Sequence, residues 1–290
     1  MNIYPKLDKN FNGLKELEKY IKKDKGVELQ FFHEDGVWEN YDFNTAINTL
    51  MKKIPSIKEI TIHPPLDDYD IELVVLKDRK LLETKIEEAI KISKQYNIKI
   101  NLLSYNISTE NDYINLLYHV GWNMKMMEQG AIEIIEKSLN LLKETNVNIV
   151  LENIFGMNEY EQKCTVIEIC KKINNPHLRA CIDVCHLHCM ANIFKLDFDS
   201  FMKSYIEKDQ AGKYVYQIHF SDTKNNDGYI NKETHGRKHN SLSEALQDYN
   251  ILKLYNMTNA NIITEISEEN YNTRKDQVDE IKLLEKIREH

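Results

Sequence analysis

The chain has 290 residues, of which 42% are hydrophobic and 29% are charged. This balance is typical of a globular protein with a large core, and it excludes a disordered regulator, a collagen-like fibre and a disulfide miniprotein. The formal net charge of −8 argues only weakly against nucleic acid as a partner, because a basic patch can lie on an acidic protein.

Eight short, nearly continuous apolar runs predict buried parallel strands, because strands covered on both faces have few polar positions. In chain order they span residues 1–6, 27–33, 59–64, 98–104, 148–154, 178–186, 214–221 and 261–267. Helical stripes lie between them, at Leu14, Leu17 and Ile21, at Leu82, Ile86, Ala89 and Ile90, and at Ile132, Ile135, Leu139 and Leu142.

The eight strand–helix units average about 36 residues each, which is long enough for parallel crossovers. A doubly wound open sheet is the alternative, but no Gly-rich turn follows the first strand. We therefore predict one α/β domain over residues 1–290, folded as a closed eight-stranded parallel TIM barrel.

Polar residues at the C-terminal ends of the strands are candidates for the active site, because a barrel of this kind carries its site there. These residues are His63, Glu152, Asp183, His186, His219, Asp222 and Glu265. Burying several carboxylates and an imidazole together is costly without a cation. Oxygen-rich ligand sets with imidazole suit Mn²⁺, Mg²⁺, Zn²⁺ or Fe²⁺. We expect one divalent metal ion, with a second left open.

Four short motifs follow one another along the chain, each at the C-terminal end of a predicted strand. They are Leu-Glu-Asn at 151–153, Ile-Asp-Val-Cys-His at 182–186, Ile-His-Phe-Ser-Asp at 218–222 and Thr-Glu at 264–265. In these motifs the chain resembles the xylose isomerase-like barrels, which include ketose 3-epimerases, sugar-phosphate isomerases and endonuclease IV-type nucleases. The resemblance implies a metal held by Glu152, Asp183, His219 and Glu265.

The sugar branch of this family implies an isomerase or epimerase acting through a metal-stabilised enediolate. Glu152 and Glu265 would be the paired catalytic acid and base. The resemblance places His63, His186, Arg237 and His239 as substrate contacts. Asp222 would orient His219 or the loop that follows.

The nuclease branch implies a three-zinc site and is the main alternative. His63, His186 and His239 match its additional ligands. Two departures count against it: residues 98–104 contain no histidine, and Arg237 stands where an Asp is expected. A biosynthetic metalloenzyme and a barrel that binds without catalysis are further alternatives.

The long segment 222–242 contains Lys224, Lys232, Arg237 and Lys238, so it can reach a phosphate. This slightly favours sugar phosphates over free sugars as the small-molecule substrate. His33, His119 and Trp122 are further candidates for contacts with substrate. The alternatives are a local hydrogen-bonding role for His33 and a core role for His119 and Trp122.

Cys181, Cys185 and Cys189 recur every four residues, a spacing that matches no common cysteine ligand motif. We interpret them as buried structural residues. No apolar run of signal length or of membrane-spanning length is present. We therefore expect a cytoplasmic chain without membrane contact, and a homo-oligomer is one expectation for a barrel of this kind.

Overall fold

A computed structural model describes residues 1–32, 41–65, 79–105, 132–133, 135–153, 164–223 and 236–289. The pocket candidates His33, His119 and Trp122 lie outside the described residues, as do Lys224 and Lys232.

The strands form a closed barrel in which each pairs in parallel with its sequence neighbours, and the last strand pairs with the first. The eight strands are β1 (Ile3–Asp8), β2 (Gly26–Gln30), β3 (Glu59–His63), β4 (Lys99–Tyr105), β5 (Val147–Glu152), β6 (Leu178–Asp183), β7 (Val215–Phe220) and β8 (Asn261–Thr264). The predicted fold, an eight-stranded parallel α/β barrel, is confirmed.

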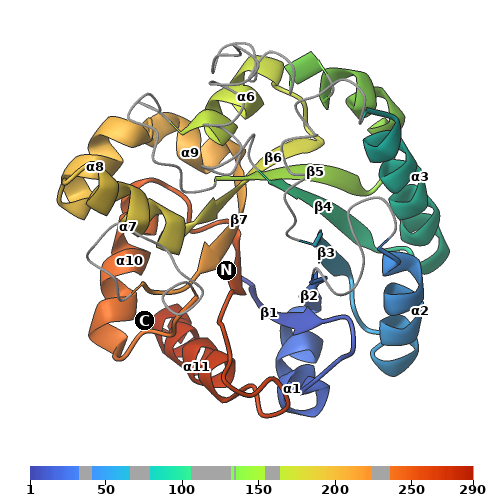
Figure 1. The fold of residues 1–290 in the computed structure, drawn as a ribbon, viewed down its shortest axis with the longest axis horizontal. Coiled ribbons are helices and arrows are strands. Elements are labelled where there is room, and N and C mark those ends of the chain that lie inside the picture. The colour runs from blue at the N-terminus through green and yellow to red at the C-terminus, as the bar shows by residue number, and fades with distance from the viewer. Residues whose placement is uncertain are drawn as a thin grey trace, which may run out of the picture.

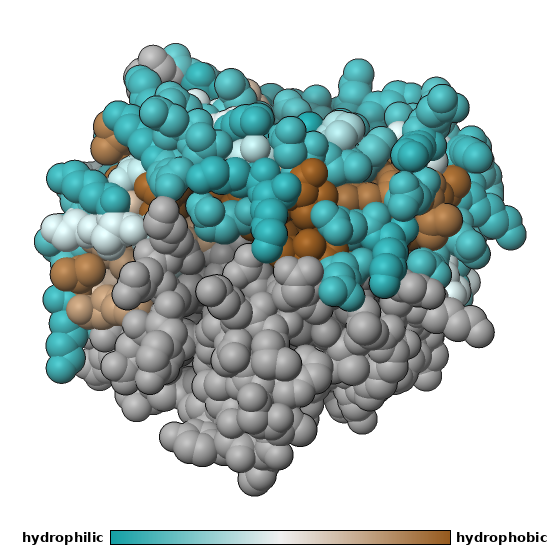
Figure 2. All heavy atoms as spheres, turned by 90° about the horizontal axis from the view of Figure 1, so that it is seen from above, coloured by the Kyte–Doolittle hydropathy of each residue, from teal (hydrophilic) through white to brown (hydrophobic). Residues whose placement is uncertain are grey.

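Helices surround the barrel, as Figure 1 shows. They are α1 (Leu14–Asp24), α2 (Phe43–Lys53), α3 (Arg79–Tyr96), α6 (Thr165–Ile173), α7 (Val184–Ile193), α8 (Phe198–Tyr205), α9 (Lys208–Tyr214), α10 (Leu242–Leu254) and α11 (Lys275–Glu289), with a 3₁₀ turn η4 (Asn140–Leu142) before β5. None of the helices in the described ranges is both long enough and apolar enough to span a bilayer. Figure 2 shows one face of the molecule. Where its atoms are coloured, this face is mainly hydrophilic, and apolar side chains are visible between the hydrophilic ones.

The prediction for the sixth strand, residues 178–186, was wrong at its C-terminal end. The strand stops at Asp183, and His186 lies in α7. The carboxylate of Asp183 accepts a hydrogen bond from the backbone N–H of His186 at 2.8 Å and so caps the helix. The apolar residues in 184–186 therefore continue a buried helix, which an apolar run alone does not distinguish from a strand.

Other strand ends also differ from the prediction, and the second strand ends at Gln30 instead of residue 33. The first strand runs two residues further than predicted, to Asp8, and the last ends at Thr264 instead of residue 267. In the first case the side chain of Asp8 accepts hydrogen bonds from the N–H groups of Asn10 and Asn12, which form the turn after the strand.

The barrel interior contains a series of hydrogen-bonded polar side chains that leads toward the C-terminal ends of the strands. Asn101 donates to Thr61 at 3.2 Å, and Thr61 donates to the amide oxygen of Gln217 at 2.9 Å. Gln217 donates to Glu28 at 2.8 Å. These four side chains are buried, so their mutual hydrogen bonds remove the cost of placing them there. They also fix the orientation of Glu28 under the candidate site.

A buried ion pair joins the last helix to the first strand. Arg274, which precedes α11, contacts Asp8 at 2.5 Å and donates to the carbonyl of Asn12 at 3.1 Å. The aliphatic part of the Arg274 side chain lies where a Cβ on Gly13 would be, and Gly13 has a positive φ of 69°. Both features make glycine the residue that this turn requires.

Replacing Arg274 by Met is expected to lower the free energy of unfolding by about 3–5 kcal/mol, because Asp8 stays buried without its cation. Urea unfolding measures this difference. The double variant Asp8→Asn/Arg274→Met, which removes both charges, should lose less than the single variant. Equal losses in the two variants would show that the ion pair does not explain the effect.

Candidate metal centre

The structure brings the four predicted metal ligands together at the C-terminal end of the barrel. Glu152 ends β5, Asp183 ends β6, His219 lies in β7 and Glu265 follows β8. One side-chain atom from each of the four lies within 4.8 Å of the others. His219 Nδ1 is 3.1 Å from a Glu152 oxygen, 2.5 Å from a Glu265 oxygen and 3.8 Å from an Asp183 oxygen. The three carboxylates therefore converge on a single ring nitrogen.

Local hydrogen bonds fix Asp183 and its neighbour Asn153 in this arrangement. Asn153 accepts from the backbone N–H of Asp183 at 2.7 Å and donates to its carbonyl at 3.4 Å. One carboxylate oxygen of Asp183 caps α7, which leaves the other oxygen on the side of His219. The end of β6 thus presents one Asp183 oxygen to the centre of the barrel.

The donor set fits a divalent cation. Within the described ranges, the Glu152 oxygen Oε2 is buried and has no hydrogen-bond partner. A buried charged oxygen in that condition is costly unless a cation compensates it. Burial alone would lower the pKa of His219, but Cys181 and the neighbouring carboxylates outweigh it and hold that pKa well above its usual range. Surroundings that attract a proton to His219 this strongly also attract a metal ion.

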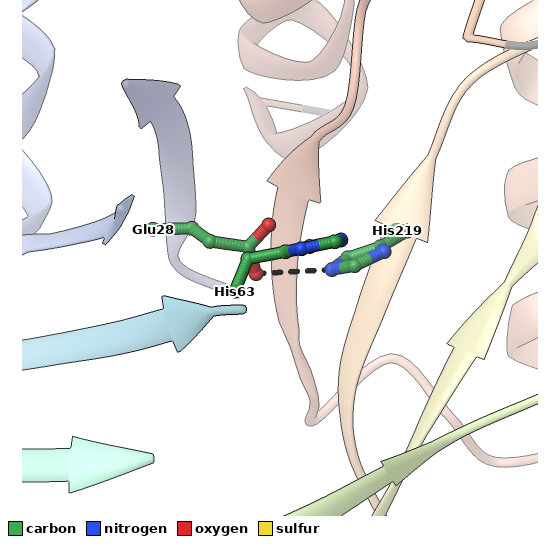
Figure 3. A group of neighbouring side chains, drawn as sticks. All are labelled: Glu28, His63 and His219. Carbon is green, nitrogen blue, oxygen red and sulfur yellow. Dashed lines mark hydrogen bonds and ion pairs between the residues drawn. The ribbon is translucent and has the colours of Figure 1, made fainter. Parts of the chain in front are cut away.

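Glu28, in β2, belongs to the site although sequence reasoning missed it. Its carboxylate lies 3.0 Å from His219 Nε2, on the opposite side of the ring from the converging carboxylates, and Figure 3 shows this contact. A carboxylate on the second ring nitrogen fixes the orientation of a ligating histidine. The signal was a charged residue in the middle of a short predicted strand, Gly-Val-Glu-Leu-Gln.

Lys6, in β1, is the second residue that sequence reasoning missed. Its ammonium is 3.1 Å from a Glu28 oxygen and contacts Glu265 directly. Burial alone would lower the pKa of Lys6, but Glu265 and Glu28 outweigh it and raise the pKa. Lys6 is therefore a cation inside the barrel.

His63 and His186, which were predicted to contact substrate, both border the ligand set. His63 stacks on His219 with ring centroids 5.9 Å apart, and its Nε2 is 3.7 Å from Glu265. Burial and Lys6 lower the pKa of His63 to about 4, so its ring is neutral at neutral pH. The Nδ1 atom of His186 is 2.7 Å from the carbonyl oxygen of Asn153.

His239 lies in a separate group of charges. Its Nδ1 is 2.7 Å from Glu280, in α11, and its Nε2 is 3.2 Å from Asp248, in α10. Burial would lower the pKa of His239, but these two carboxylates raise it to about 10. Asp248 also contacts His188 at 2.9 Å. With a carboxylate on each nitrogen, His239 is held as an imidazolium, which has no lone pair for a metal or substrate proton.

Asp222 and Arg237 pair through their backbones, at the two ends of the long loop. The N–H of Asp222 donates to the carbonyl of Arg237 at 2.7 Å, and the reverse bond is 3.1 Å. The Asp222 side chain accepts from the N–H of Thr223 at 2.7 Å. Asp222 was predicted to orient His219 or the loop. The carboxylate on His219 Nε2 belongs to Glu28, and the backbone of Asp222 joins the two ends of the loop.

All five cysteines lie in the described part of the chain; they are buried, and none forms a disulfide. Burial raises the pKa of Cys181 to about 12. The interpretation of Cys181, Cys185 and Cys189 as buried residues is confirmed.

A family model for xylose isomerase-like TIM barrels matches residues 25–287 of the chain. The chain belongs to this family. It is 33% identical over 124 residues to a probable endonuclease 4 of Mycoplasma mobile, an alignment that covers 41% of this chain and 43% of the relative. The match thus spans less than half of that relative's length.

Two solved structures illustrate the similarity of fold. D-Psicose 3-epimerase from Clostridium cellulolyticum has a TM-score of 0.60 at 12% identity, covering 99% of this chain and 98% of that one. The IOLI protein, solved with a zinc atom, has a TM-score of 0.55 at 14% identity, covering 98% of this chain and 95% of that one. At these identities the similarity shows the fold alone.

Glu152→Gln and Asp183→Asn are expected to weaken divalent-ion binding by more than the roughly 10–100-fold that loss of an outer partner typically costs. Isothermal titration of the chelator-treated protein with Mn²⁺ measures the affinity. The matched control is Glu59→Gln, a carboxylate in the same barrel that is hydrogen-bonded to Asn101, Tyr216 and Asn261 away from the ligand set. Equal losses in Glu59→Gln and Glu152→Gln would contradict the assignment.

The raised pKa of His239 predicts a pH-dependent contribution to stability. The folded-state pKa is about 10 and the unfolded value is about 6.5, so the contribution is full below pH 6.5 and is lost as the pH rises through about 10. The difference in free energy of unfolding between the wild type and His239→Asn should therefore shrink over this range.

Urea unfolding at several pH values measures this difference. The control is His177→Asn, which removes a ring that contacts the carbonyl of Val147 instead of a carboxylate. A wild-type to His239→Asn difference that does not change with pH would contradict the ionic role of His239.

Proposed function

We propose that the chain is a divalent-metal-dependent isomerase or epimerase that acts on a small open-chain sugar or sugar phosphate. The observation that supports this most is the composition of the ligand set: three carboxylates and one imidazole that suit one ion, with both candidate acid/base residues among them. His239, which a third ion would need, is instead held between Glu280 and Asp248.

Glu152, Asp183, His219 and Glu265 would hold the metal ion. When bound, a divalent ion polarises the substrate carbonyl and acidifies the adjacent C–H. Glu152 and Glu265 come from β5 and the end of β8, which two intervening strands separate around the barrel. They can therefore approach a substrate from different sides, as removal and return of a proton on opposite faces requires.

The Nδ1 atom of His63 lies 3.1 Å from the carbonyl oxygen of Pro64 and carries the ring proton, so its Nε2 would accept a hydrogen bond from a substrate hydroxyl. His186 would contact a second substrate oxygen. Arg237 would contact a phosphate or a distal hydroxyl from the loop. The two contacts of His239 lead us to reassign it from substrate binding to holding the segment that carries Arg237.

A second candidate function is metal-dependent cleavage of DNA at abasic sites. The observation that favours it is the 33% identity to a probable endonuclease 4, although the alignment covers only part of both chains. A second potential ligand group, formed by Glu28, His63 and His219, also lies in the barrel. This function needs more than one ion in the site.

Incubation of the Mn²⁺-loaded protein in D₂O with a panel of ketoses and ketose phosphates should place deuterium at the carbon beside the carbonyl. NMR and mass spectrometry detect the exchange. Glu152→Gln and Glu265→Gln should each reduce the exchange rate by about 10²–10⁴-fold, because each removes a proton-transfer group.

Lys99→Met serves as the control, since Lys99 contacts Tyr216 away from the ligand set. A lack of exchange across the panel, together with cleavage of an abasic-site oligonucleotide, would overturn the proposal in favour of the nuclease.

A further inference from the structure

The position of Lys6 bears on how many ions the centre can hold. Lys6 and Glu28 are directly paired across β1 and β2, so both side chains enter the barrel at the same level. The Lys6 ammonium contacts one oxygen of Glu28 at 3.1 Å and the Oε1 oxygen of Glu265. That same Glu265 oxygen is 3.7 Å from His63 Nε2.

The surroundings of the ammonium have the composition of a metal site. Two carboxylates contact the ammonium, and the imidazole of His63 lies 3.7 Å from one of them; carboxylate oxygens and imidazole nitrogens are donors that divalent ions prefer. Figure 3 shows Glu28 and His63 directed toward His219 from neighbouring strands. The second potential ligand group, formed by Glu28, His63 and His219, shares the Glu28 carboxylate with the ammonium, so a divalent ion bound there would lie beside its positive charge.

We infer that Lys6 takes the place of a second metal ion and restricts the centre to one. The inference rests on the metal centre of the proposed function and goes beyond it by assigning a role to a residue outside the ligand set. The ammonium donates a hydrogen bond to the Oε1 oxygen of Glu265 and forms an ion pair with the Oε1 oxygen of Glu28. The other Glu265 oxygen remains on the side of His219 Nδ1, with Glu152 and Asp183.

This arrangement also explains how four carboxylates share the interior of one barrel. Glu28, Glu152 and Asp183, which are buried, and Glu265, which is partly exposed, all surround His219. One fixed ammonium and one divalent ion together balance most of their charge, and a second divalent ion is needed only when the ammonium is removed.

The test is the number of ions bound per chain. Chelator-treated wild type, Lys6→Met and Lys6→Arg are loaded with Mn²⁺, separated from excess metal by gel filtration and analysed by mass spectrometry for metal content. The expected result is a rise from about one ion per chain in the wild type to about two in Lys6→Met, with about one in Lys6→Arg.

The ligands of the second ion are tested with double variants. Lys6→Met/His63→Ala and Lys6→Met/Glu28→Gln should each return to about one ion per chain, because each removes one donor of the second set. Two Mn²⁺ ions in ligand groups that share His219 should also give a spin-coupled electron paramagnetic resonance signal in Lys6→Met that the wild type lacks. Lys99→Met controls for the loss of a barrel lysine and should bind as the wild type does.

Lys6→Gln is measured in parallel in case Lys6→Met fails to fold. It removes the positive charge but keeps a hydrogen-bond donor near Glu28. One ion per chain in folded Lys6→Met or Lys6→Gln, two ions in the wild type, or failure of both of these variants to fold in saturating Mn²⁺ would overturn the inference. A wild type that binds no ion would instead overturn the metal centre itself, so the two failures are distinguishable.

Discussion

The concentration of negative charge at the C-terminal end of the barrel is the constraint on which the rest of the site depends. Glu28, Glu152 and Asp183 are buried, and Glu265 joins them at the mouth. Carboxylates can share such a volume only where cations and hydrogen-bond donors compensate them. Two side chains compensate the carboxylates in this way. Lys6 pairs with two of them, and His219 lies among all four.

The barrel supplies this arrangement because parallel strands bring distant residues to one level. Lys6 and Glu28 are register partners on adjacent strands, and so are Asp183 and His219. Below them, the hydrogen-bonded series of side chains that ends with Gln217 and Glu28 continues the polar interior away from the site. The orientation of His219 is therefore determined from both sides of its ring.

The sequence was sufficient to predict the barrel, and apolar strands of regular spacing place their polar end residues at one rim. The four side chains that converge there were selected from those end residues by the resemblance to the family. The sequence was not sufficient for Glu28 and Lys6, which lie within strands and acquire partners only when β1 pairs with its two neighbours. The sequence also did not predict the contacts of His239 with Glu280 and Asp248. They depend on which faces of α10 and α11 turn toward each other, and neither helix carries a pattern that specifies a histidine partner.

Lys6 and His239 illustrate one physical principle in two places. In each, a protein cation lies between two carboxylates and balances their charge. A permanent ammonium or imidazolium balances charge but cannot act as a Lewis acid, so it stabilises the site without adding reactivity. If Lys6 takes the place of a second ion as we propose, the number of such fixed cations limits the number of metal ions within one barrel fold. That number separates one-ion proton transfer next to a carbonyl from the several-ion chemistry that phosphodiester cleavage uses.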